Sequence, residues 1–218
     1  MLRVAVAGAA GRMGATTCAA VEGAEDMELT GRADPTLGTS IQDVLGDADV
    51  LVDFTLPDQV VANARTAAHA GVHVVIGATG WAEADLREAV AGAPGKVFSA
   101  PNFAIGAVLM MRFAAEASRI MQGAEIIEYH HPAKLDAPSG TAARTAQLMQ
   151  GDPTIHSVRL PGVVADQDVI LGDVAQTLTI RHVTTNRTSF MPGVLLAIRH
   201  VAELPESPVF GLDQLLWP

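Results

Sequence analysis

Residues 2–14 read LRVAVAGAAGRMG, and this segment is the strongest indication of the fold in the sequence. The apolar run 2–7 is typical of a strand, and glycines spaced G-x-x-G-x-x-G follow it directly at positions 8, 11 and 14. Glycines permit a tight turn, and a helix that opens there offers free N–H groups and its positive dipole end to a pyrophosphate. The stretch predicts a dinucleotide-binding turn, with an ordinary glycine-rich turn as the alternative.

Outward from this turn, the first hundred residues alternate short β-branched runs with longer alanine-rich amphipathic runs. This pattern is typical of βαβ units around a parallel sheet that is covered on both faces. The expected strands are 2–7, 27–33, 50–54, 73–76 and 97–100, and the expected helices begin near Gly11, Pro57 and Trp81.

After Pro101 the pattern changes. We expect a helix from about 105 to 121, a strand at 124–129, a helix at 139–150, and several strands without helices over 156–187. A last helix, from Pro192 to near Pro205, is expected to return to the first unit. The predicted class is α/β: a dinucleotide-binding domain of residues 1–103 and 193–218, and an α+β domain of residues 104–192 with a mixed or antiparallel sheet.

Composition excludes several classes of protein. The 218 residues are 49% apolar and carry a formal net charge of −10, so an extensive core is expected and nucleic acid is not an expected partner. The apolar run 103–111 ends at Arg112, far short of the roughly 20 residues of a membrane helix, so no membrane association is expected. The single cysteine, Cys18, favours a reducing compartment, and we expect a cytoplasmic protein.

Further residues at the ends of the expected strands suit a nucleotide. Asp34 follows Gly14 by 20 residues, where an acidic side chain usually meets the adenosine ribose and favours NAD. Arg12 lies in the turn and could instead pair with a 2′-phosphate, so NADP stays open. The loops 77–80 (GATG) and 100–103 (APNF) follow the fourth and fifth strands and suit a nicotinamide ring, while Phe54 could face the cofactor or the core.

The stretch 128–142, EYHHPAKLDAPSGTA, carries the strongest chemical signal. His130, His131 and Lys134 lie within five residues, just before a helix start that Ser139 is suited to cap. Backbone N–H groups at Gly140 and Thr141, at an uncovered helix N-terminus, would add to this positive charge and favour a carboxylate ligand. In an otherwise acidic protein, such a cluster predicts a site for a small anionic molecule.

Other interpretations of this stretch are weaker. A metal site would need a third ligand, for which Asp136 is the only candidate, and we expect none. No triad is evident around Ser139, whose capping role accounts for it. Isolated histidines are usually structural or solvated, and we assign no role to five of them: His69, His73, His156, His182 and His200.

The segment 130–142 resembles the signature of the 4-hydroxy-tetrahydrodipicolinate reductase (dihydrodipicolinate reductase) family, which acts in the diaminopimelate route to lysine. The segments 8–14, 52–55, 77–80, 100–103 and 190–194 resemble the same family in the same order, so the likeness covers nearly the whole chain. It implies a Rossmann-like cofactor domain, a substrate and oligomerisation domain whose sheet builds a homotetramer, and hydride transfer from NADH or NADPH to a small dicarboxylate.

The resemblance also implies roles for individual residues. His130 is expected to be the proton donor or acceptor and Lys134 a proton donor. The substrate is assigned to His131, Lys134, Ser139, Gly140, Thr141 and Thr79. The dinucleotide is assigned to Gly8, Ala9, Ala10, Gly11, Arg12, Met13, Asp34, Phe54, Gly77, Ala78, Thr79, Ala100, Pro101, Asn102 and Phe103.

Two departures from the family pattern stand out. Ala78 replaces a common threonine in a loop that acts through its backbone. The segment from Met149 to Ile155 is shorter than in typical members, which could alter the contacts between subunits. Two other functions stay open: a nicotinamide-dependent enzyme for a different small acid, and a dinucleotide sensor without activity.

Overall fold

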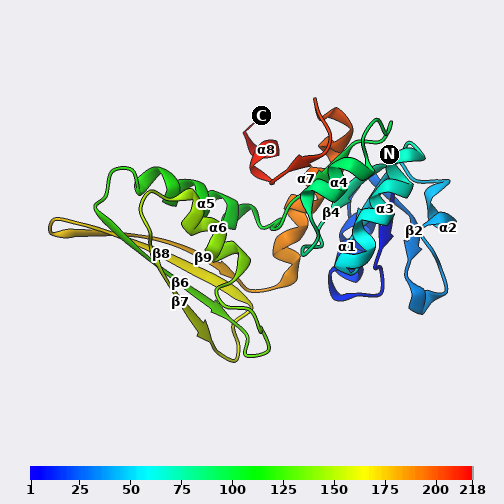
Figure 1. Cartoon of the computed structure of the whole chain (residues 1–218). Coiled ribbons are helices and arrows are strands. Elements are labelled where there is room, and N and C mark those ends of the chain that lie inside the picture. The colour runs from blue at the N-terminus through cyan, green and yellow to red at the C-terminus, as the bar shows by residue number, and fades with distance from the viewer. Residues whose placement is uncertain (218) are drawn as a thin grey trace. The chain divides into compact units, whose positions relative to one another are not determined.

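The computed structural model describes residues 1–217 and divides the chain into two compact units (Figure 1). Unit 1 comprises Met1–Phe103 together with the chain from Phe190 onward, and unit 2 comprises Ala104–Ser189. None of the helices in residues 1–217 combines the length and hydropathy that a membrane-spanning segment requires.

Unit 1 is built on a six-stranded sheet in which every pair of neighbouring strands is parallel. The strand order is β10-β5-β4-β3-β1-β2, which confirms the predicted parallel sheet. The five predicted strands are present, two of them one residue shorter than expected. The strands are β1 (Leu2–Ala7), β2 (Met27–Ala33), β3 (Val50–Asp53), β4 (His73–Ile76), β5 (Val97–Ser99) and β10 (Val209–Phe210).

Helices cover this sheet because its central strands are apolar on both faces. Side chains of one face, among them Leu51 and Val74, share a core with Val60 and Leu86 from the helices that follow β3 and β4. Alternate residues such as Val6 and Phe98 are also fully buried, as expected for a sheet covered on both sides. The helices are α1 (Arg12–Glu22), α2 (Gln42–Leu45), α3 (Pro57–His69) and α4 (Glu83–Ala89), and a 3-10 turn covers Pro35–Leu37.

The end of the chain, including its last two helices, belongs to unit 1. α7 (Met191–His200) contacts α1 and β4 and continues into a 3-10 turn at Val201–Glu203. The Arg199 guanidinium binds the Asp26 carboxylate through two hydrogen bonds of 2.7 and 2.9 Å and lowers the pKa of Asp26 to about 2. A short helix, α8 (Asp213–Leu216), follows β10.

Unit 2 contains a mixed four-stranded sheet with the order β7-β6-β8-β9. β6 and β7 are parallel and the other two pairs are antiparallel, which confirms the mixed alternative. Two helices lie on one face of this sheet (Figure 1) and share a core with it that includes Met110, Ala142, Ile126 and Val169. The elements are α5 (Ile105–Ala117), β6 (Gly123–His130), α6 (Gly140–Leu148), β7 (Thr154–Arg159), β8 (Ala165–Asp173) and β9 (Gln176–Thr184).

Both helices of unit 2 end earlier than predicted. α5 ends at Ala117, where the side chain of the next residue, Ser118, takes part in other hydrogen bonds. Its hydroxyl donates to the nearby Ala115 carbonyl and accepts the distant Gln150 N–H at 2.8 Å. α6 stops at Leu148 because Met149 adopts an extended backbone and is buried.

Candidate active site

The glycine turn of unit 1 leaves no room for side chains. Gly8 has a positive φ of 73°, and a Cβ atom there would lie 2.7 Å from the Phe54 carbonyl oxygen. A Cβ atom at Gly14 would lie 2.0 Å from the Gly8 carbonyl oxygen. Gly11 is the N-cap residue of α1 and has no side chain with which to cap it. The N-terminal N–H groups of α1 are therefore framed by bare backbone, as a pyrophosphate requires.

Asp34 lies beside this turn, immediately after β2. Its Oδ2 accepts a hydrogen bond from the Ala10 N–H at 3.1 Å, and its Oδ1 accepts from the Thr36 hydroxyl and N–H at 2.7 and 2.9 Å. The Thr36 hydroxyl, followed by these N–H groups, lowers the pKa of Asp34 below its ordinary value. The carboxylate stays ionised and has lone pairs left for ribose hydroxyls.

The other predicted cofactor residues lie along the same carboxyl edge of the sheet. The Phe54 ring covers Gly77, where a Cβ atom would come within 2.1 Å of it. The loop 77–80, which begins with Gly77, is held by the Trp81 indole, which donates to the Ala78 carbonyl at 2.8 Å. Ala100 and Phe103 are buried, whereas Thr79 and Pro101 are exposed and Asn102 is half-buried.

These residues fit a dinucleotide on structural grounds. The cradle at Gly8 and Gly14 would be filled by any Cβ atom, and the carboxylate of Asp34 adjoins it. Neighbouring loops bring small residues to the same edge, so NAD(P)H could lie along it with the phosphates at α1.

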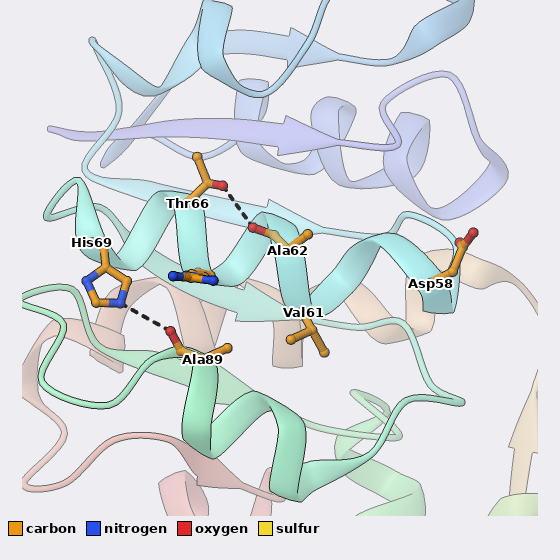
Figure 2. Close-up of a pocket in the computed structure, with 7 residues that line it drawn as sticks. Asp58, Val61, Ala62, Thr66, His69 and Ala89 are labelled. Carbon is orange, nitrogen blue, oxygen red and sulfur yellow. Dashed lines mark hydrogen bonds between the residues drawn. The ribbon is translucent and has the colours of Figure 1, made fainter.

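A separate groove in unit 1 runs along α3 and faces α4 (Figure 2). It has a volume of about 810 Å³ and is lined by Arg65, His69 and neighbours, none of which is a predicted site residue. His69 Nε2 lies 3.1 Å from the Ala89 carbonyl oxygen (Figure 2), so this histidine links the two helices.

In unit 2, the helix-covered face of the sheet changes from apolar to polar along β6. Ile126, Glu128 and His130 alternate onto this face, because successive strand residues point to opposite sides. Ile126 lies in the core, whereas Glu128 is a carboxylate with no exposed surface. A buried carboxylate is costly unless it is paired and hydrogen-bonded.

Glu128 is paired twice. Its Oε2 lies 2.5 Å from His130 Nδ1, and both of its oxygens accept hydrogen bonds from Arg159, at 2.9 and 3.0 Å. Burial alone would raise the pKa of Glu128, but hydrogen bonds from Arg159, Ser157 and His130 outweigh it and lower the pKa. An ionised carboxylate only accepts hydrogen bonds, so His130 Nδ1 carries a proton and Nε2 is the ring nitrogen left for a ligand.

The electrostatics of His130 combine opposing effects. Burial lowers the pKa of His130 below its ordinary value, and the positive charges of Lys134 and Arg159 lower it further. Glu128 opposes these effects by favouring the protonated ring. Burial and the neighbouring cations therefore favour the neutral imidazole, while Glu128 provides a carboxylate partner for the protonated form.

Lys134 is not a free cation in this structure, contrary to the open cationic cluster expected from the sequence. Its Nζ binds both carboxylate oxygens of Asp136 at 2.8 Å and lowers the pKa of Asp136. The Asp136 side chain is 63% exposed, so this ion pair is solvated, and another carboxylate can replace Asp136 as the partner of Lys134. Asp136 is thus a partner of Lys134, and among residues 1–217 no group of three His, Cys, Asp or Glu side chains is placed to hold a metal ion.

The loop between β6 and α6 leads to the predicted helix cap. The Lys134 N–H donates to the His131 carbonyl at 3.1 Å, so residues 131–134 form a turn. Ser139 is the N-cap of α6, as predicted, and its hydroxyl accepts the Ala142 N–H at 3.2 Å. Gly140 is exposed and Thr141 half-buried at the first turn, so a carboxylate can approach the helix there.

Two members of this cluster, Glu128 and Arg159, are not among the site residues predicted from the sequence. Glu128 stands two residues before His130, which places both on one face of a strand, and this spacing could have indicated the pair. Arg159 lies 31 residues from Glu128, and only the β6–β7 register brings it opposite His130. The five histidines without an assigned role include His73, His156 and His200, which bind the Lys96 N–H, Glu125 and Glu203.

A glycine-cradled helix at a parallel sheet edge, and a second unit with a histidine–lysine cluster, define an NAD(P)H-dependent oxidoreductase. Two family models match the chain: "Dihydrodipicolinate reductase, N-terminus" over residues 2–103 and "Dihydrodipicolinate reductase, C-terminus" over residues 106–216. The chain belongs to the dihydrodipicolinate reductase family.

Individual proteins support this assignment. The chain is 43% identical over 245 residues to the 4-hydroxy-tetrahydrodipicolinate reductase of Mycolicibacterium vanbaalenii, with 99% of both chains covered. It is 45% identical over 247 residues to that of Thermobifida fusca, again with 99% of both covered. Dipicolinate-bound dihydrodipicolinate reductase from Paenisporosarcina sp. TG-14 superposes with a TM-score of 0.82 at 36% identity, covering 98% of this chain and 99% of that one.

Proposed function

We propose that this chain reduces 4-hydroxy-tetrahydrodipicolinate to tetrahydrodipicolinate with NADH or NADPH, in the diaminopimelate route of lysine biosynthesis. The observation that carries the proposal is the buried Glu128–His130 pair beside Lys134 and the N-terminus of α6, in a chain of this family. A dicarboxylate substrate matches this chemistry, since each carboxylate needs hydrogen-bond donors or positive charge.

In unit 1, the dinucleotide would be held by the residues that frame the glycine cradle. The N–H groups at the start of α1 would bind the pyrophosphate, and the Asp34 carboxylate would accept from ribose hydroxyls. Gly77, Ala78, Thr79 and the segment 100–103 would contact the nicotinamide end. When bound, the reduced nicotinamide supplies the hydride.

In unit 2, the chain's own residues would bind the substrate and manage a proton. His131, Ser139, Gly140 and Thr141 would hold the carboxylates. The Lys134 ammonium would exchange Asp136 for a substrate carboxylate and donate a proton as negative charge develops on the ring. His130 would give or take a proton through Nε2, because Glu128 occupies Nδ1.

The cofactor preference rests on two neighbouring groups. The ionised Asp34 favours the unmodified ribose of NADH and repels a 2′-phosphate. Arg12 at the start of α1 could attract that phosphate, so we propose that both cofactors are used.

The direct test is steady-state kinetics with freshly generated 4-hydroxy-tetrahydrodipicolinate, run separately with NADH and NADPH. We expect cofactor oxidation that depends on the substrate and saturates with it. Dinucleotide binding without oxidation would point to a sensor, and oxidation only with another small acid would point to a different reductase; both would refute the proposal.

We further propose a cytoplasmic homotetramer built through the unit 2 sheet. Apolar side chains exposed around the β8–β9 hairpin, Val174, Leu178 and Val183, suit burial against other subunits. Only five residues separate Leu148 of α6 from Thr154 of β7, and this short connection could change the assembly. Light scattering coupled to gel filtration measures the state, and a monomeric mass would refute this proposal.

A further inference from the structure

Glu128 is a carboxylate with no exposed surface and no assigned role, and it contacts His130 directly. We propose that Glu128 is a positioning residue for His130, and that Arg159 maintains Glu128 in this role. The inference rests on the proposed function, because it specifies how one of its proton-transferring groups is oriented.

The contact with Glu128 fixes the direction of the His130 ring. Its Nδ1 lies 2.5 Å from Glu128 Oε2, and the two residues share the helix-covered face of β6. A carboxylate at Nδ1 selects the tautomer with a proton on that nitrogen, so Nε2 becomes the nitrogen that meets the substrate. Without this contact, the ring could rotate and either nitrogen could carry the proton.

When His130 takes up a proton, the carboxylate beside it stabilises the imidazolium. The charged groups around the ring are Glu128 from β6, Arg159 from β7, and Lys134 and Asp136 from the following loop. Arg159 and Lys134 repel the protonated ring. Glu128 is the buried carboxylate that stabilises the protonated form of His130.

The Arg159 guanidinium binds both Glu128 oxygens and also donates to the Asp136 carbonyl at 2.8 Å. Arg159 therefore balances the buried negative charge of Glu128. It also links β7 to the loop in which Lys134 lies. One arginine thus couples the orientation of His130 to the placement of Lys134.

The test compares Glu128→Gln with the parent chain and with Glu125→Gln. Glu125 is a matched control, since it also lies on β6 and binds a histidine, His156, at 2.6 Å, but is 54% exposed. Long-range proton–nitrogen NMR correlations report the protonation of each imidazole nitrogen, and a His130→Asn variant assigns the signals. Kinetics over a pH series report the pKa values of the groups that act.

We expect the parent to show His130 protonated on Nδ1 and Glu128→Gln to show a mixture of tautomers. In Glu128→Gln, kcat/KM should fall about 10- to 100-fold, and the decline of activity at high pH should begin at lower pH, because the imidazolium has lost its partner. Glu125→Gln should match the parent in rate and in the His130 signals.

A parent-like tautomer and rate in Glu128→Gln would overturn the inference, as would a loss of rate with an unchanged pH profile. Should Glu128→Gln fail to fold because Arg159 is left unpaired, Glu128→Gln combined with Arg159→Met removes both charges and carries the same readouts. A parent that does not reduce the substrate refutes the proposed function instead, while the nitrogen signals still report on the Glu128–His130 pair.

Discussion

Replacing Lys134 with alanine is expected to lower kcat by about 10²–10⁴-fold, the usual cost of removing a positioned proton donor. Lys134 lies in the loop between β6 and α6, and its present partner is a solvated carboxylate that a substrate can replace. Replacing His130 with alanine should lower kcat by a similar factor, since it removes the second proton-transferring group. Steady-state kinetics measures both effects.

Dinucleotide affinity should stay nearly unchanged in both variants, because the expected dinucleotide contacts are in unit 1. NADH fluorescence titration checks this. Lys96→Ala is the matched control, since Lys96 is the other lysine of the chain and lies in unit 1; its turnover should equal that of the parent. Parent-like turnover in both Lys134→Ala and His130→Ala would refute the assignment of proton transfer to this cluster.

Replacing Gly14 with alanine is expected to destabilise the protein and weaken dinucleotide binding together. The added Cβ atom would lie 2.0 Å from the Gly8 carbonyl oxygen and 2.9 Å from the Ala9 Cα atom, so the backbone of the turn must move. Overpacking of this kind costs about 1–3 kcal/mol of folding free energy. We expect a fall of that size in urea denaturation and at least a tenfold loss of NADH affinity.

Gly23→Ala is the control on the same helix. Gly23 caps the C-terminal end of α1, and a Cβ atom there would meet the Ala19 carbonyl oxygen at an ordinary 3.4 Å. This variant should stay within about 0.5 kcal/mol of the parent and bind NADH equally well. Equal behaviour of the two glycine variants would mean that the turn does not need its bare backbone.

The sequence was most informative where structure follows from local pattern. The β-branched runs of unit 1 predict its first five strands, because a parallel sheet buried on both faces needs nearly continuous apolar residues. The cap at Ser139 follows from its place before a helical run. β10, in contrast, has only two residues, too few to show a periodic pattern. It pairs with β5, which lies more than 100 residues earlier in the sequence.

The candidate site shows the same division between local and distant information. Its histidines, lysine and helix cap lie within one short segment, so their proximity could be predicted. The partners of these groups could not: the Arg159–Glu128 contact depends on the pairing of β6 with β7, and the Lys134–Asp136 pair depends on the conformation of a loop. These partners decide which ring nitrogen and which cation are available to a substrate.

Binding of a dicarboxylate at the segment between β6 and α6 can be tested by mapping amide chemical shifts during titration of the protein with dipicolinate, in the presence of NADH. We expect changes concentrated at His130, His131, Lys134 and the first turn of α6. Changes confined to the groove along α3, around Arg65 and His69, with residues 130–141 unaffected, would contradict this expectation.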